Sequence, residues 1–122
     1  AEGVQIGTRF ALTEESSASS VFKDYCLSLR EGDTKLLLKK LAPTRLVKNA
    51  FREAVEKAED SGASAEDLRT LLGRGRAKKG IFEGELEIGQ VSAIISRRQS
   101  VAEVMNELVA AYQRAAKKDY LF

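Results

Sequence analysis

Apolar residues recur every three or four positions along most of the chain, which is the spacing of amphipathic helices. This pattern predicts one helix over 19–30, a second over 46–59, and a third that begins after the N-cap residue Ser64 and has two acids in its first turn. The predicted buried faces of these three helices contain Val21, Phe22, Tyr25, Cys26, Leu29, Val47, Ala50, Phe51, Ala54, Val55, Ala58, Leu68, Leu71 and Leu72.

Glycines interrupt the pattern in the second half of the chain before it becomes helical again. The stretch 73–87 contains Gly73, Gly75, Gly80 and Gly84, and this composition predicts loops and short turns. The apolar stretch 88–95 predicts a short buried helix. The last helix begins after Ser100, because Ser100 and Glu103 have the spacing of a capping box ahead of a long amphipathic pattern.

Two stretches favour extended structure. Val4 and Ile6 are β-branched and alternate with Gln5, which predicts a strand at the start of the chain. The stretch 34–41 is short, apolar and flanked by lysines, and we interpret it as extended chain packed against a neighbouring element. The pattern as a whole predicts one strand followed by a mainly helical remainder.

The predicted strand ends at a Gly-Thr pair that is suited to receive a phosphate. Gly7 has no side chain to keep a ligand from the backbone, and Thr8 adds a hydroxyl donor beside its amide. Phosphate groups of cofactors often lie at the loops after the seventh and eighth strands of (β/α)8 barrels. An ordinary strand followed by a turn explains the same residues, so both interpretations stay open.

The length of 122 residues fits one domain, whereas a complete (β/α)8 barrel needs about 250. If 4–6 is a barrel strand, most of the barrel lies outside this chain. The start at Ala1 rather than at a methionine suggests that upstream sequence was removed. No stretch is apolar enough to span a bilayer and none has the pattern of a signal segment, so we expect a cytoplasmic protein without a membrane partner.

The charge and the residue types of the chain argue against nucleic-acid binding, and against catalytic residues or a metal site in this segment. The net charge of +2 provides no general polyanion-binding surface, so nucleic acid is not an expected partner. The chain has no histidine, and its carboxylates are spread over helical faces beside basic residues. We therefore expect no catalytic residue and no metal site in this segment. The single cysteine, Cys26, excludes an internal disulfide and is interpreted as a buried structural thiol.

Several motifs, in order along the chain, resemble one flavoprotein family. They are GVQIGTRF at 3–10, TEES at 13–16, EGDT at 31–34 and the Gly-Gln pair at 89–90. Together they are similar to the C-terminal part of the family that contains nitronate monooxygenases, formerly called 2-nitropropane dioxygenases, and the FMN-dependent enoyl-acyl-carrier-protein reductases of type II. The stretch 73–84, with 85–90 after it, is similar to one branch of that family.

The resemblance implies an α/β fold, the C-terminal portion of a TIM barrel with an attached, mainly helical subdomain. Residues 1–32 would form the last barrel strand and the helix after it, 33–96 a glycine-interrupted helical subdomain, and 97–122 a helix that packs back on the barrel. The segment itself would be mostly α. The remainder of the barrel, and the histidine that the family uses as catalytic acid or base, would come from elsewhere in the same polypeptide.

The resemblance also implies a cofactor, FMN, held without a covalent bond. The residues implied at its phosphate, mainly through backbone amides and one hydroxyl, are Gln5, Ile6, Gly7 and Thr8. Gly89 and Gln90 match a pair that the family places near the flavin and the substrate cavity. The Gln90 amide would either hydrogen-bond a substrate or tie down a helix start, and its chemistry serves both purposes equally well.

Arg74 and Arg76, with Lys78 and Lys79, form a basic cluster that is interpreted in two ways. It could bind the phosphates of NAD(P)H or of a phosphopantetheine carrier, since arginine forks suit phosphate oxygens, or it is a solvated loop. The cluster favours reduction of an enoyl thioester by NAD(P)H over oxidation of a small-molecule nitronate. The alternative function is a non-catalytic helical interaction module whose strand-like N-terminus pairs with a partner's sheet, and a homodimer is left open.

Overall fold

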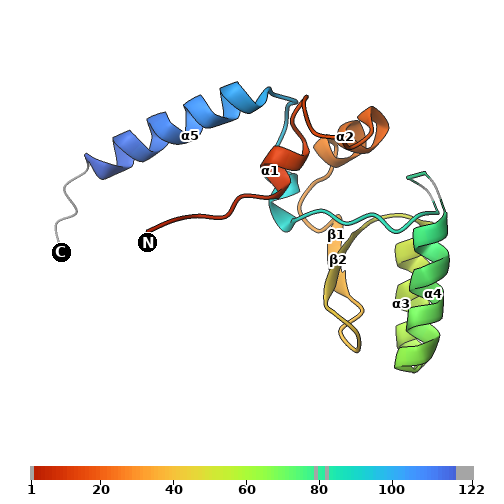
Figure 1. Cartoon of the computed structure of the whole chain (residues 1–122). Helices are drawn as coiled ribbons and strands as arrows, with labels where there is room; N and C mark the ends of the chain where they lie inside the picture. The colour runs from red at the N-terminus through yellow and green to blue at the C-terminus, as the bar shows by residue number, and fades with distance from the viewer. Residues whose placement is uncertain (1, 79, 82, 118–122) are drawn as a thin grey trace.

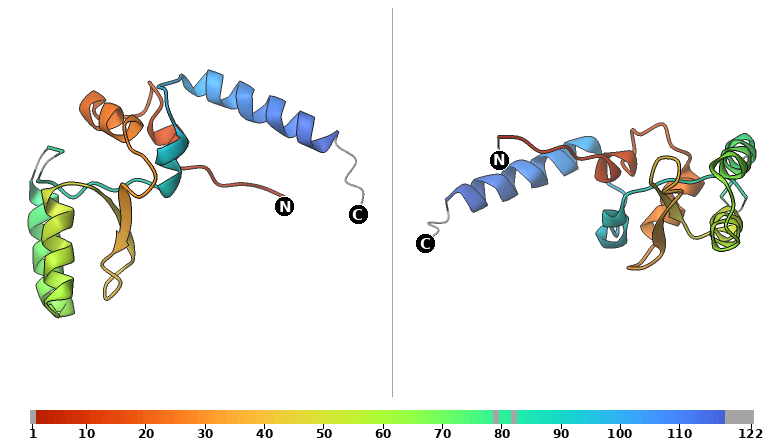
Figure 2. Two further views of the ribbon diagram at one scale, coloured as in Figure 1. Left: turned by 180° about the vertical axis from the view of Figure 1, so that it is seen from behind. Right: turned by 90° about the horizontal axis from the view of Figure 1, so that it is seen from below.

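A computed structural model describes residues 2–78, 80–81 and 83–117 of the chain. Its elements are α1 (Thr8–Ala11), α2 (Ser20–Leu27), β1 (Thr34–Leu37), β2 (Thr44–Val47), α3 (Ala50–Asp60), α4 (Ala65–Ala77), the 3-10 helix η1 (Gln90–Ile94) and α5 (Val101–Ala116). The α3–α4 pair lies on one side of the β1–β2 hairpin and α1, α2 and η1 lie on the other, while α5 extends away from both (Figures 1 and 2).

The hairpin replaces the start of the predicted second helix. β1 pairs with β2 in antiparallel register, with Thr34 opposite Val47. Extended structure is therefore confirmed for the first half of 34–41, but the helix predicted from residue 46 begins only at Ala50. Asn49 sets this boundary, because its side-chain oxygen accepts a hydrogen bond from the Arg52 amide at 2.9 Å and caps α3.

Adjacent residues of β2 contribute to two different hydrophobic clusters. Leu46 packs in the cluster between the hairpin and the α3–α4 pair, and Val47 packs in the cluster formed with α2 and the segment before η1. Side chains of successive strand residues point to opposite faces, so one strand serves both. The first cluster contains Leu37, Leu38, Leu46, Phe51, Val55 and Leu68. The second contains Leu12, Cys26, Leu29, Val47 and Ile88.

The third helix begins as predicted but does not stop at the first glycine. Ser64 and Asp67 form a capping box at its start, and α4 then continues through Gly73 and Gly75 to Ala77. Gly75 is buried, and a Cβ atom there would come within 2.6 Å of Phe51 Cδ2. The loop prediction was wrong at this point because the glycine permits close packing of α4 on α3 rather than a break in the helix.

The predicted first strand is also not formed. Residues 4–6 are extended, but no strand among the described residues pairs with them, and Val4 is 82% exposed. A strand requires a hydrogen-bonded neighbour, which this part of the chain does not supply. Instead of a simple turn, the residues after Gly7 form the single helical turn α1.

The remaining helices begin where they were predicted, but α2 ends at Leu27 rather than at residue 30, and Val21, expected on its buried face, is 60% exposed. α2 begins after Ser19 and buries Cys26, whose pKa is raised to about 11 by burial. η1 lies within the predicted stretch, but it buries Ser92 and exposes Val91 and Ile94. α5 begins at the predicted capping box of Ser100 and Glu103.

Candidate functional site

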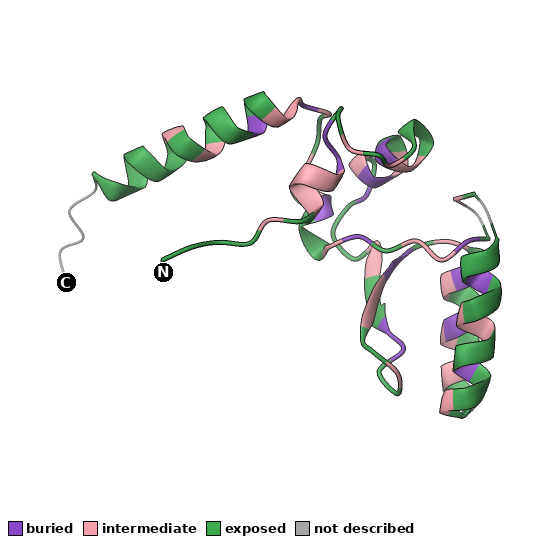
Figure 3. Ribbon diagram, viewed as in Figure 1, coloured by how far each residue is buried: buried purple, intermediate pink, exposed green. Residues whose placement is uncertain are grey.

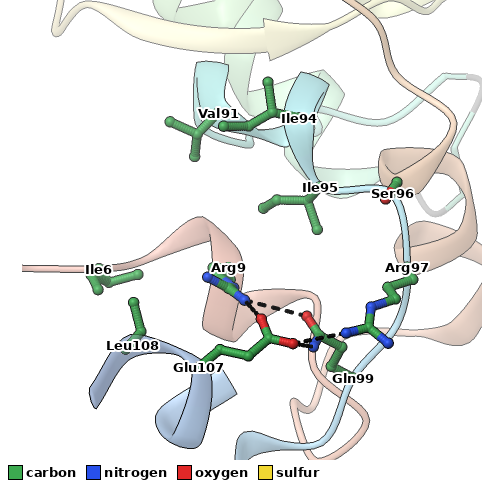
Figure 4. A pocket seen from close by; sticks show the side chains of 10 residues that line it. All are labelled: Ile6, Arg9, Val91, Ile94, Ile95, Ser96, Arg97, Gln99, Glu107 and Leu108. Carbon is green, nitrogen blue, oxygen red and sulfur yellow. Dashed lines mark hydrogen bonds and ion pairs between the residues drawn. The ribbon is translucent and has the colours of Figure 1, made fainter. Parts of the chain in front are cut away.

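The described residues bring α1, η1 and the first half of α5 together around the predicted phosphate-binding loop (Figure 4). Thr8, at the start of α1, and Gly89, just before η1, are 81 positions apart in the chain and are joined by a hydrogen bond. The Gly89 amide donates to Thr8 Oγ1 at 2.9 Å. Thr8 and Gly89 are thus in direct contact. From the sequence, Thr8 was expected at the cofactor and Gly89 on the substrate side.

Gly7 leaves its backbone open on one side. Its φ and ψ of −100° and −69° are accessible to any residue, so its conformation does not require glycine. A Cβ atom at this position would meet no atom within 4 Å. No contact with the described residues therefore accounts for glycine here, and the open backbone is available to a ligand.

A polar cluster fixes the end of the loop to α5. Glu107 on α5 accepts hydrogen bonds from Arg9, from Gln99 at 2.6 Å and from Arg97 at 2.8 Å (Figure 4). Gln99 is buried, and its side-chain oxygen also faces Arg9 at 3.5 Å. A carboxylate held by two guanidinium groups and an amide is occupied as an acceptor, so Glu107 joins elements rather than acting as a base.

The hydrogen bond from Gln99, together with Arg9 and Arg97, holds the pKa of Glu107 below its ordinary value of 4.5. Because the folded state binds this proton more weakly than the unfolded state does, stability from Glu107 is present above pH 4.5 and is lost as the pH falls through the lowered pKa. We expect Glu107→Gln to flatten the decline of the thermal midpoint between about pH 5 and pH 3. The measurement is thermal unfolding followed by circular dichroism, with exposed Glu31→Gln as the matched control. Parallel midpoint curves for wild type and Glu107→Gln would contradict this role.

Two hollows adjoin the loop. A cavity of about 440 Å³ is lined by Ile6, the polar cluster and the apolar side chains of η1, including Val91 and Ile94 (Figure 4). A larger apolar groove of about 790 Å³ lies between the N-terminal segment and α5. The groove is lined by Val4, Gln5, Ile6, Phe10, Met105, Leu108, Val109 and Tyr112. Much of this apolar surface is exposed, as Figure 3 shows for the outer turns of α5.

The Gln90 side chain lies away from the Gly-Thr loop. It is exposed and lines a different hollow, of about 530 Å³, between η1 and the turn 30–34. The structure therefore connects the Gly-Gln pair to the loop through the Gly89 backbone, whereas the Gln90 side chain faces another surface.

The structure does not bring Arg74 and Arg76 together. They are two positions apart on α4, so their side chains leave opposite faces of the helix. Arg76 pairs with Glu85 at 2.8 Å, and Arg74 lines a shallow pocket with Lys78 beside Phe51. Lys79 lies outside the described residues. Both arginines belong to α4, which lies on the far side of the hairpin from α1 (Figure 2).

Among residues 2–78, 80–81 and 83–117, no group of three or more potential ligands could hold a metal ion. No helix of this part of the chain is long and apolar enough to cross a bilayer. The polar cluster of Arg9, Gln99 and Glu107 was missed by sequence reasoning, because Arg9 and Glu107 are 98 positions apart and no local pattern connects them.

Comparison with known families decides the relationship. The model of the nitronate monooxygenase family matches residues 1–111 of the chain. The chain belongs to the nitronate monooxygenase family. Its members are oxidoreductases and include flavin-dependent enzymes. Comparison with the curated proteins gives no match.

Solved structures of the same family have the same local fold. The chain is 25% identical to FabK from Thermotoga maritima, an enoyl-acyl-carrier-protein reductase II, with a TM-score of 0.76 over 96% of this chain. A mutant of the same FabK gives 21% identity and a TM-score of 0.72, again over 96% of this chain. The chain spans 39% and 36% of those two proteins. It is a small mixed α/β structure that matches part of a TIM-barrel enzyme.

Proposed function

We propose that this chain is the C-terminal part of an FMN-dependent oxidoreductase and that Gly7 and Thr8 contact the FMN phosphate. The observation that carries the proposal is the family match over nearly the whole chain, which includes the Gly-Thr loop. The same loop is open where a ligand would approach, because a Cβ at Gly7 would meet nothing within 4 Å. The absence of histidine from this chain agrees with a catalytic group on another part of the protein.

The residues at the loop fit a phosphate. Gly7 and Thr8 offer backbone amides at the start of α1, where the first amides of a helical turn have no partner within it. The Thr8 hydroxyl oxygen already accepts from Gly89, and its hydrogen remains for a phosphate oxygen. Gln5 and Ile6 precede the loop and line the groove beside it. FMN, when bound, would supply the redox chemistry, and this segment would hold its phosphate end.

The remaining barrel would cover the apolar groove. The chain spans only 39% of the FabK chain that it matches, and the groove exposes large apolar side chains on both of its walls. Val4 is 82% exposed and Tyr112 is 74% exposed, which is costly for a surface that stays in water. Preceding barrel strands of the same polypeptide would pair with 4–6 and pack against α5. The division into 1–32, 33–96 and 97–122 remains part of this proposal.

The similarity to FabK favours reduction of an enoyl thioester with NAD(P)H over oxidation of a nitronate. In that reaction the substrate is an acyl thioester and NAD(P)H is the source of the hydride. Gly89 and Gln90 are the candidates on the substrate side, since η1 adjoins both the loop and a separate hollow.

An absorbance spectrum tests the proposed function directly. The full-length protein, purified from its complete reading frame, is expected to be yellow and to release FMN on denaturation, whereas the 122-residue segment alone is expected to be colourless. A full-length protein that never binds flavin would overturn the proposal and favour the helical interaction module. Adding an enoyl thioester or a nitronate to the yellow protein then distinguishes the two reactions.

Arg74 provides a test of the nicotinamide preference. Arg74 on α4 and Lys78, the C-cap residue of that helix, both line the pocket beside Phe51, so their charges can act on one phosphate. Lys78 also pairs with Glu83, which lines the same pocket, at 3.1 Å. Arg74→Glu is expected to raise the KM for NADPH about tenfold with little change in kcat, since it replaces an attraction by a repulsion of the order of 1.4 kcal/mol. Arg69→Glu, exposed on the same helix, is the control. Equal KM values in both variants would assign Arg74 to the solvated surface.

A further inference from the structure

Both residues contribute to the contact between Thr8 and Gly89. Thr8 supplies the acceptor for the Gly89 amide at 2.9 Å, and a Cβ atom on residue 89 would overlap Thr8 Oγ1. Gly89 has φ of −69° and ψ of 155°, which are ordinary for any residue. Glycine is thus required at 89 by the Thr8 hydroxyl and not by the backbone conformation.

This contact lies at the start of η1. Gly89 caps η1 without a side chain, and its carbonyl accepts from the Ser92 amide at 3.1 Å, which forms the first turn. Ser92 is fully buried, so the turn is fixed on its inner side. Its outer side presents Gln90, Val91 and Ile94 to the solvent. A movement of Thr8 would therefore be transmitted to the backbone that orients these three side chains.

We infer that Thr8 is a positioning residue that couples the FMN phosphate to η1: its oxygen holds the Gly89 amide, and its hydrogen is left for the phosphate. The inference rests on the proposed function and adds a link between the cofactor and the substrate side. A hydroxyl can accept one hydrogen bond and donate another at the same time, and each polarises the other. Binding of the phosphate would strengthen the Gly89 contact and fix η1 before a substrate arrives.

Hydrogen exchange at the Gly89 amide measures this coupling without relying on turnover. In the full-length apoprotein, Thr8→Val is expected to speed exchange at Gly89 by about five- to tenfold, because the amide loses its acceptor, whereas Thr8→Ser retains the hydroxyl and the protection. Addition of FMN should slow exchange at Gly89 in wild type and in Thr8→Ser, but not in Thr8→Val. Thr70→Val, a matched change at an exposed position of α4, should leave Gly89 unaffected.

The failures of the two proposals have different signatures. FMN that binds without changing exchange at Gly89 would overturn the coupling and leave the proposed function standing. A full-length protein that binds no FMN would overturn the proposed function and the coupling with it.

A double-mutant cycle on FMN affinity gives a second test that does not depend on Thr8→Val folding correctly. Gly89→Ala alone should weaken FMN binding several-fold, because the added Cβ displaces Thr8 Oγ1. In a Thr8→Ala background, which removes that overlap, Gly89→Ala should have no further effect. Gly73→Ala, where a Cβ meets nothing within 4 Å, is the matched control. An equal effect of Gly89→Ala in both backgrounds, or none in either, would overturn the coupling.

Discussion

Gly75→Val is expected to lower the free energy of unfolding by about 2–3 kcal/mol, the upper range for overpacking a close-packed interior. Gly75 faces the Phe51 ring in the contact between α4 and α3, and a Cβ atom would come within 2.6 Å of Phe51 Cδ2. The ring cannot retreat freely, because Phe51 is itself 5% exposed and packed in the first hydrophobic cluster. The two helices must therefore move apart or the ring must leave its position. Chemical denaturation of the full-length protein measures the loss.

Gly73 provides the control within the same helix. It is exposed, and a Cβ there would meet nothing within 4 Å, so Gly73→Ala should stabilise α4 by about 0.5–1 kcal/mol. Two glycines of one helix, two positions apart, would thus respond with opposite sign. The combination of Gly75→Val with Phe51→Ala should cost less than the sum of the single changes, because the second change makes room for the first. Strict additivity would contradict the packing explanation.

Gly7→Val is expected to weaken FMN binding by about 10- to 100-fold, which corresponds to about 1.5–3 kcal/mol for a lost hydrogen bond to a charged group. The side chain would occupy the open side of the loop, where the phosphate is proposed to approach the backbone. The measurement is a titration of the full-length apoprotein with FMN, followed by quenching of flavin fluorescence.

Folding and binding can be separated at this position. Gly7 has no neighbour within 4 Å of its Cβ position and no unusual φ, so circular dichroism and the thermal midpoint of the apoprotein should change little. Gly3→Val, which also meets nothing within 4 Å, is the matched control and should retain FMN. Wild-type affinity in Gly7→Val would remove this loop from the phosphate site.

The sequence predicts the parts of the fold that depend on near neighbours. The N-cap at Ser64 and the capping box at Ser100 were identified because each depends on only a few consecutive residues, and both start helices in the structure. Leu46 and Val47 were misassigned to a helix because a short apolar run suits a strand equally well, and only pairing with β1 distinguishes the two. The helical role of Gly75 depends on Phe51, which the local pattern does not reveal.

The same limit applies to the candidate site. The Gly-Thr loop and the Gly-Gln pair were visible as motifs, but their contact joins residues 81 positions apart. Arg9 and Glu107 are still further apart, and each alone resembles an ordinary surface charge. The interpretation of Arg74 and Arg76 as one phosphate-binding cluster assumed a loop, whereas the continuing helix directs them to opposite faces.

Because Leu46 and Val47 occupy successive positions of β2, the two halves of the molecule share a single strand at their centre. A shift of the hairpin register by one residue would turn each of these side chains to the opposite face and disrupt the packing of both hydrophobic clusters at once. Loss of either interior would likewise release the strand from the other. The lobe that contains α4 and the lobe that contains the Gly-Thr loop are therefore expected to melt as one cooperative unit, so that damage to the distant helix pair lowers the population of molecules able to retain a cofactor.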